Sequence, residues 1–305
     1  MGLSEKIQQR ESGILVYGIT PPKAGTDTEK VREIANKQIE RLKGLDLDGL
    51  ILYDIQDEAS RTQVERPFPF METLDGLAYS NEFLGDLSIP KIIYRSAGKY
   101  QQDELTDFLT SQDMKNNASV FVGAASKGQS VTLSMREAYE LKKRINDEMP
   151  LGGVTIPERH MDKGDEHLRV FKKMEAGCQF FVSQGVYDVN ACKNFLSDYY
   201  YHGNENNIPL APVLLTLTPC GSAKTLDFMK WLGISIPRWL ENDMLHSQDI
   251  LQKSVDVCVE SWKEIQSFAK EKNIPLGANI ESVATRKVEI DASIDLYHQI
   301  KTTMS

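Results

Sequence analysis

The sequence predicts an α/β protein of the (β/α)8, or TIM, barrel class. Eight short apolar runs recur along the 305 residues, and polar or amphipathic stretches separate them. No linker rich in Pro or Gly divides the chain. Eight strand–helix repeats close a parallel barrel, which typically takes about 250 residues plus extensions. We therefore expect residues 1–305 to form one barrel domain, with a short polar N-terminal extension and a C-terminal helix.

The expected strands are rich in Val, Ile, Leu, Tyr and Phe, as parallel strands buried on both faces usually are. They cover residues 14–20, 49–55, 91–97, 119–125, 152–157, 180–185, 213–218 and 276–282. An open doubly wound sheet is the competing arrangement, and its first turn normally carries a glycine-rich phosphate-binding loop. The first turn here reads Thr20-Pro21-Pro22-Lys23, so the closed barrel is favoured.

The segments between the strands show helical periodicity and suitable cap residues. The first opens on Thr26 and Asp27 and closes on Gly44, residue types preferred at helix N- and C-termini. The expected helices cover residues 26–44, 103–109, 134–146, 165–175, 188–201, 223–232 and 247–272. Trp231 and Trp239 flank a short turn, and we expect both to pack in the core.

Composition excludes several classes of function. A net charge of -9 argues against broad nucleic-acid binding. The sequence has no apolar run of about 18 residues, so no membrane span is predicted. The four cysteines form no CxxC pair, which favours reduced thiols in the cytoplasm. No HxH or HExxH spacing supports a metal site, and no GxSxG motif supports a serine hydrolase. A cytoplasmic enzyme without a metal is expected.

Four local patterns occur in order in the second half of the chain. They are Ile-Pro-Glu-Arg-His at 156–160, Phe-Lys-Lys-Met-Glu-Ala-Gly at 171–177, Ser-Gln-Gly-Val-Tyr-Asp at 183–188 and Gly-Ile-Ser-Ile-Pro-Arg-Trp at 233–239. Together they resemble the methylenetetrahydrofolate reductase family. Residues 19–23 and Arg61-Thr62 match the family more loosely, and the resemblance extends in order over nearly the whole chain.

The resemblance implies a flavoprotein oxidoreductase of one-carbon metabolism. In that family the barrel holds FAD, a nicotinamide donor reduces the flavin, and methylenetetrahydrofolate becomes methyltetrahydrofolate. Matched by motif, Gln184 would bind the pterin ring, because an amide offers both a donor and an acceptor. The side chains matched to the cofactor's ribose and phosphates are mostly cationic, as a pyrophosphate requires. They are His160, Arg169, Lys172 and Lys173.

Two acidic residues of the family are missing. The family's first strand ends in a glutamate that acts as general acid, and Gly18 takes that position here, beside Tyr17. Its fourth strand ends in Arg-Gly-Asp, whereas residues 122–125 read Val-Gly-Ala-Ala. Losing a general acid costs about 10²–10⁴ in rate, so a reductase needs a substitute. Candidates at other strand ends are Tyr17, Asp54, Glu58, Glu158 and Glu281, of which Tyr17, Glu158 and Glu281 are our predicted catalytic residues.

Active sites of such barrels lie at the carboxyl ends of the strands. The strand-end side chains assigned to the substrate are therefore Gln184, Asp54, Tyr94, Arg95 and Asn279. Arg95 places a cation in the expected barrel mouth, which suits an anionic group such as a folate glutamate tail or a cofactor phosphate.

Three activities and one non-catalytic role remain open from the sequence. The leading one is a flavin-linked reductase acting on a reduced folate. The second is a flavin-independent methyltransferase that moves a methyl group between tetrahydrofolate and a partner, and a third is the use of another flavin or deazaflavin with a different substrate. The non-catalytic role is that of a regulatory descendant of the family. The expected partners are a reduced folate and either a nicotinamide donor or a methyl-transfer protein, with no nucleic acid or membrane, in a homo-oligomer.

Overall fold

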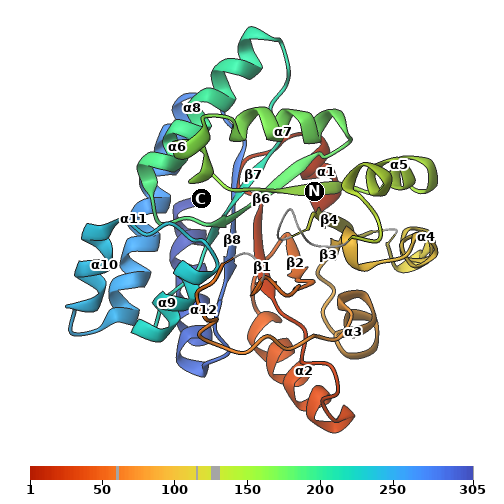
Figure 1. Ribbon diagram of the computed structural model, residues 1–305, viewed down its shortest axis with the longest axis horizontal. Helices are drawn as coiled ribbons and strands as arrows, with labels where there is room; N and C mark the ends of the chain where they lie inside the picture. The colour runs from red at the N-terminus through yellow and green to blue at the C-terminus, as the bar shows by residue number, and fades with distance from the viewer. Residues whose placement is uncertain (60–61, 115, 125–130, 305) are drawn as a thin grey trace. The chain divides into compact units, whose positions relative to one another are not determined.

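A computed structural model of the chain describes residues 1–59, 62–114, 116–124 and 131–304. The eight strands are parallel and form a closed barrel in sequence order (Figure 1). They are β1 (Leu15–Ile19), β2 (Gly49–Leu52), β3 (Lys91–Ser96), β4 (Ala118–Val122), β5 (Leu151–Thr155), β6 (Phe180–Gly185), β7 (Val213–Leu217) and β8 (Leu276–Glu281). The predicted fold class is confirmed. Arg61 and Ala125 lie outside the described residues.

The helices expected between the strands are all present. They are α2 (Thr28–Leu42), α4 (Gln102–Thr110), α5 (Met135–Ile145), α7 (Glu166–Glu175), α8 (Val189–Glu205), α9 (Ala223–Trp231) and α11 (Ile250–Glu271). The C-terminal helix is α12 (Lys287–Met304). As expected from its sequence, α2 begins at an aspartate cap, because the Asp27 side chain accepts from the backbone N–H of Glu29 at 3.0 Å.

In the described part of the chain, four further α-helices were not predicted, because they are short: α1 (Leu3–Gln8), α3 (Gly76–Phe83), α6 (Arg159–Lys163) and α10 (Arg238–Leu245). The N-terminal segment is more than a polar extension, since Leu3 and Ile7, one helical turn apart, are both buried. The expectation for Trp239 was wrong. Its side chain is 63% exposed at the start of α10, whereas Trp231 is 7% exposed.

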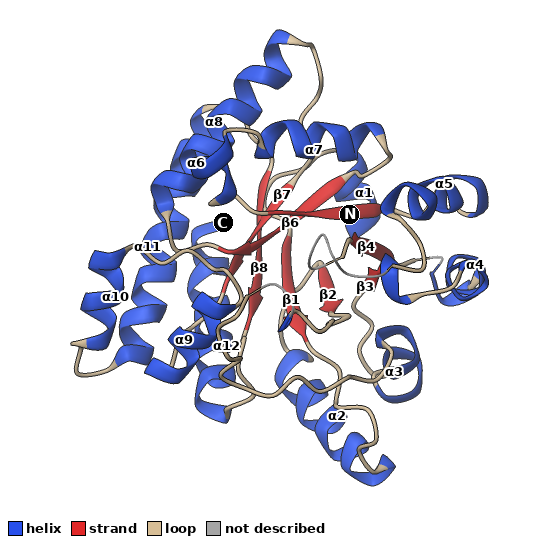
Figure 2. Ribbon diagram, viewed as in Figure 1, coloured by secondary structure: helices blue, strands red, loops and turns tan. Residues whose placement is uncertain are grey.

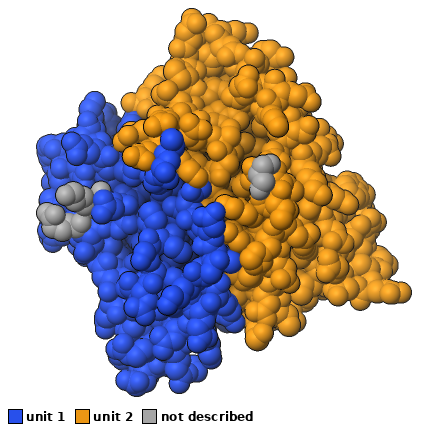
Figure 3. Space-filling model, turned by 180° about the vertical axis from the view of Figure 1, so that it is seen from behind, with its two compact units in different colours: residues 1–4, 16–153, 176–178 blue, residues 5–15, 154–175, 179–305 orange. Residues whose placement is uncertain are grey.

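The chain divides into two compact units (Figure 3). Unit 1 comprises residues 1–4, 16–153 and 176–178, and unit 2 comprises residues 5–15, 154–175 and 179–305. The boundary falls inside β5. In unit 2, α12 packs on β8, and α11 packs between α8 and α12 (Figure 2). The single-domain organisation expected from the sequence stays a prediction.

Each unit has its own apolar core, made largely by the strands. In unit 1, Leu50, Ile93 and Val120 are fully buried, and in unit 2 Phe181 and Leu215 are. All four cysteines are buried, and none of them forms a disulfide bond. Among the described residues, no helix has the length and apolar character needed to cross a membrane.

Candidate functional site

Arg95, near the end of β3, is only 4% exposed. Its guanidinium forms an ion pair with Asp75, donates to the Tyr100 hydroxyl at 3.1 Å, and lies 4.1 Å from the Phe108 ring centroid. Burial alone would raise the pKa of the Asp75 carboxyl, but the hydrogen bond from Arg95 brings it below the usual value. Arg95 is thus engaged inside unit 1, and its binding of an external anion stays a prediction.

Asp54, directly beyond β2, joins the same network. Its Oδ2 accepts from the backbone N–H of Ser96 at 2.7 Å and from the Tyr100 hydroxyl at 3.0 Å. Its Oδ1 accepts from Lys99 Nζ at 2.6 Å. The carboxylate therefore connects the ends of β2 and β3. A direct role in holding substrate stays a prediction for Asp54.

Gly18, which the resemblance matches to the family's general acid, lies against the ring of Tyr53. A Cβ atom built on Gly18 would come within 2.8 Å of the Tyr53 hydroxyl oxygen, closer than real Cβ contacts allow. Tyr53 in turn packs edge-on against Tyr94, with ring centroids 4.8 Å apart. The space next to Gly18 is thus filled by a phenol from the neighbouring strand end, while Tyr17 is buried within β1.

The end of β4, where the resemblance puts the second missing acid, also has a neutral polar side chain beside it. Gln56 donates its side-chain Nε2–H to the carbonyl oxygen of Gly123 at 3.0 Å. Tyr53 and Gln56 both follow β2, so one segment supplies neutral polar groups next to both altered positions. Sequence reasoning considered carboxylates and Tyr17 as substitutes and missed these two. Their place just beyond a strand end was the available signal.

In unit 2, the pairing of β6 with β7 is irregular just before Gln184. Val182 pairs with Leu214 and Gly185 with Thr216, so β6 carries one extra residue between these pairs. The Ser183 hydroxyl fills part of the gap by accepting from the backbone N–H of Thr216 at 2.9 Å. Bulges of this kind commonly redirect side chains beside functional sites.

Gln184 is held by the loop that follows α9. Its Nε2 donates to the carbonyl oxygen of Leu232 at 2.7 Å. Ile234 in the same loop would lie 3.1 Å from a Cβ atom at Gly185, so a glycine there lets the loop approach. The side-chain nitrogen of Gln184 is engaged by Leu232. Its Oε1 accepts no hydrogen bond from the described residues, so this oxygen can accept one from a ligand.

Asn279 and Glu281 continue this polar row onto β8. Asn279 Nδ2 donates to Thr216 Oγ1 at 3.0 Å and approaches Glu281 Oε2 at 3.4 Å. Thr216 Oγ1 donates to the carbonyl oxygen of Ser183 at 2.6 Å. The structure therefore brings together two of the predicted site residues, Asn279 and Glu281, and hydrogen bonds through Thr216 connect them to Ser183, the residue before Gln184.

Glu158, just beyond β5, is a buried carboxyl group, with the residue 8% exposed. Neither of its oxygens has a well-formed hydrogen bond among the described residues. Burial raises its pKa to about 8, and the nearby charges of Asp188 and Glu166 add to the effect. At neutral pH the group is therefore mostly protonated and can act as a proton donor.

The four side chains assigned to cofactor phosphates do not form one cationic cluster. His160 Nε2 lies 3.0 Å from Asp198 Oδ2 on α8, and Lys173 Nζ donates to the carbonyl oxygen of Val154. Arg169 pairs with Asp165 at 3.3 Å, while Lys172 is exposed. His160, Lys173 and Arg169 are thus engaged by groups of the protein itself, and the assignment of these residues to the phosphates of FAD stays a prediction.

Comparison with known proteins identifies relatives of the chain. The family model of methylenetetrahydrofolate reductase matches residues 126–273. Among solved structures, a Clostridium thermocellum protein that binds two copies of 5-methyl-5,6,7,8-tetrahydrofolic acid is 52% identical, with 99% of both chains covered and a TM-score of 0.88. A 2,3-dimethylmalate lyase is 14% identical over 97% of this chain and 93% of that chain, with an uninformative TM-score of 0.44. No curated protein matches.

Proposed function

The chain belongs to the methylenetetrahydrofolate reductase family, and from this premise we propose that it is an enzyme that binds a reduced folate through Gln184. The observation that carries the proposal is the way β6 and the loop after α9 hold this amide. A pterin ring presents N–H donors along one edge, and Gln184 Oε1 can accept from them. Such a prearranged polar group gives orientation and specificity in a binding site.

The relative from Clostridium thermocellum supports the choice of ligand. It binds 5-methyl-5,6,7,8-tetrahydrofolic acid in two copies. At 52% identity over almost the whole length of both chains, the same class of ligand is the natural first candidate here. We extend the proposal to two bound folates for this chain as well.

Of the possible activities, the geometry favours methyl transfer without flavin. His160 and Lys173, matched to cofactor phosphates, are engaged with Asp198 and the β5 backbone. Both family carboxylates are replaced, with neutral groups beside them. The chain would then move a methyl group between tetrahydrofolate and a partner, and the flavin-linked reductase is the alternative.

Methyl transfer from methyltetrahydrofolate places a chemical demand on the site. The bond between N5 and the methyl carbon breaks, the methyl group passes to a nucleophile on the partner, and the electron pair stays on N5. N5 leaves more readily when it is protonated, so a proton donor is needed. Among Tyr17, Glu158 and Glu281, we assign this role to Glu158, because its raised pKa of about 8 keeps the proton near neutral pH.

Calorimetric titration with 5-methyltetrahydrofolate tests the folate site. We expect the wild-type chain to bind and Gln184→Ala to bind about tenfold more weakly, which corresponds to one lost hydrogen bond. Gln266→Ala is the matched control, since its amide also donates to a backbone carbonyl oxygen, that of Thr303, and its affinity should be unchanged. Equal affinities for wild type and Gln184→Ala would disprove the pterin contact.

A second measurement separates the two activities. The purified chain is mixed with FAD and freed of unbound flavin, and its visible absorbance is recorded. We expect no flavin band, together with methyl transfer from methyltetrahydrofolate in the absence of flavin. A retained flavin that the folate reoxidises would instead establish the reductase.

A further inference from the structure

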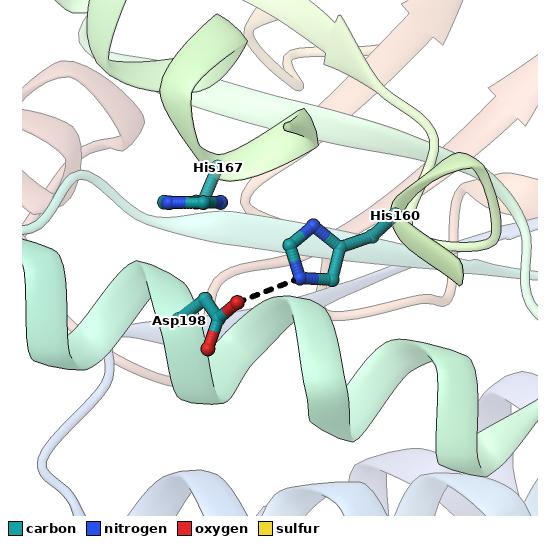
Figure 4. Close-up of side chains that lie close together, drawn as sticks. All are labelled: His160, His167 and Asp198. Carbon is teal, nitrogen blue, oxygen red and sulfur yellow. Dashed lines mark hydrogen bonds and ion pairs between the residues drawn. The ribbon is translucent and has the colours of Figure 1, made fainter. Parts of the chain in front are cut away.

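Two histidines and an aspartate from three helices of unit 2 lie close together (Figure 4). They are His160 on α6, His167 on α7 and Asp198 on α8. Each offers a ligand atom within 4.8 Å of the other two. The imidazole rings stand edge to face, with centroids 5.2 Å apart. Sequence spacing did not reveal this group, because each residue comes from a different helix.

An ordinary ion pair between His160 and Asp198 explains only part of this arrangement. It uses Nε2 of His160, but Nδ1 of His160 and Nδ1 of His167 are buried without a hydrogen-bond partner among the described residues. A buried polar atom without a partner costs about 1–3 kcal/mol. An ion bound between His160 Nε2 and Asp198 Oδ2 would give Nδ1 of His167 the partner that the ion pair does not supply.

We propose that His160, His167 and Asp198 bind one divalent transition-metal ion, with Zn²⁺ the best match. Imidazole and carboxylate are ordinary zinc ligands, and three protein ligands with a water complete a tetrahedral shell. Two imidazoles argue against Ca²⁺ or Mg²⁺, which prefer oxygen ligands.

The donors need only a modest adjustment to close around the ion. Zinc–nitrogen bonds of about 2.0–2.1 Å place tetrahedral ligands roughly 3.3 Å apart, compared with the 4.8 Å limit found here. The Asp198 side chain is largely exposed and can move inward. The ring of His202, one turn further along α8, packs against Phe171 with centroids 4.7 Å apart, so we assign the fourth position to water.

The ion would join α6, α7 and α8. Helix α6 has only five residues, too few to be stable alone, and it directly follows Glu158. A metal bound only by the folded chain stabilises it according to its concentration and affinity. We therefore assign the ion a structural role that holds α6, and with it the chain just beyond β5.

Metal titration of the chelator-treated protein tests the site. With Zn²⁺, we expect one ion per chain and a higher melting temperature, and with Co²⁺ the visible absorption of a tetrahedral site. His167→Ala and Asp198→Asn should each weaken Zn²⁺ binding at least tenfold. Asp198→Asn can keep a hydrogen bond to His160, and circular dichroism checks that both variants fold.

His246→Ala is the matched control, because His246 is an exposed histidine outside the cluster and its loss should leave Zn²⁺ binding unchanged. No Zn²⁺ binding by the wild type, or equal affinity in wild type, His167→Ala and Asp198→Asn, would overturn the proposal. The site is independent of the proposed folate function, since Zn²⁺ affinity is measured without folate and Gln184→Ala should retain it.

Discussion

Glu158 couples the candidate site to pH. Its carboxyl group is buried next to Asp188 and Glu166, which disfavours the charged form and raises the pKa to about 8 from 4.5. In the unfolded chain the group would titrate near its ordinary value. Between these two pH values the folded state therefore holds a proton that the unfolded state has lost.

The sign of the resulting pH dependence follows from this difference. The contribution of Glu158 to stability is greatest below about pH 4.5 and is lost as the pH rises toward 8. Glu158→Gln removes this titration while keeping the shape of the side chain. The difference in the free energy of unfolding, variant minus wild type, should therefore be roughly 3 kcal/mol larger at pH 7 than at pH 4.5.

Urea unfolding of both proteins across this pH range measures the effect of Glu158. The difference between variant and wild type isolates the one group, because the other titrating groups are shared. A difference that does not change with pH would show that Glu158 has an ordinary pKa. Glu158→Gln should also lose most methyl-transfer activity if Glu158 supplies the proton.

Asp75, the residue that caps the N-terminus of α3, makes two stabilising contacts. The Asp75 side chain accepts from the backbone N–H of Ala78 at 2.9 Å, which caps the helix, and it also pairs with the buried Arg95. Removing a partner from a buried charge costs about 3–5 kcal/mol, because the remaining charge is left uncompensated. Losing a helix cap alone costs about 1 kcal/mol.

Asp75→Ala should therefore lower the free energy of unfolding by about 3–5 kcal/mol. Asp27→Ala is the matched control, since Asp27 caps α2 in the same way and should cost about 1 kcal/mol. Chemical denaturation measures both variants. Similar losses in the two would show that the Asp75–Arg95 pair adds little beyond the cap.

At the scale of the whole molecule, the cooperativity of thermal unfolding tests whether the chain forms the single domain expected from the sequence. The boundary between the compact units falls inside β5, so neither unit contains all of that strand. We therefore predict one cooperative thermal transition, with equal calorimetric and van't Hoff enthalpies. Two resolved heat-capacity peaks would instead indicate two independently unfolding units.

Much of the fold could be predicted because its signals are local. The apolar strand runs and helix periodicity depend on residues close in the sequence, and so does the cap at Asp27. Short helices such as α6 lack enough turns to show a period, and they were missed. Trp239 was misplaced because an apolar side chain does not by itself reveal which way its helix faces.

The sequence alone determined the eight-stranded barrel, the family resemblance and the strand-end positions of Gln184 and Glu158. Only the tertiary structure decided that Tyr53 lies against Gly18, that Asp75 pairs with Arg95, and that His167 joins His160 and Asp198. Hydrophobic periodicity depends on residues that are close in the sequence, whereas these contacts join residues on different helices and strands. Their separation and burial exist only after the chain has folded.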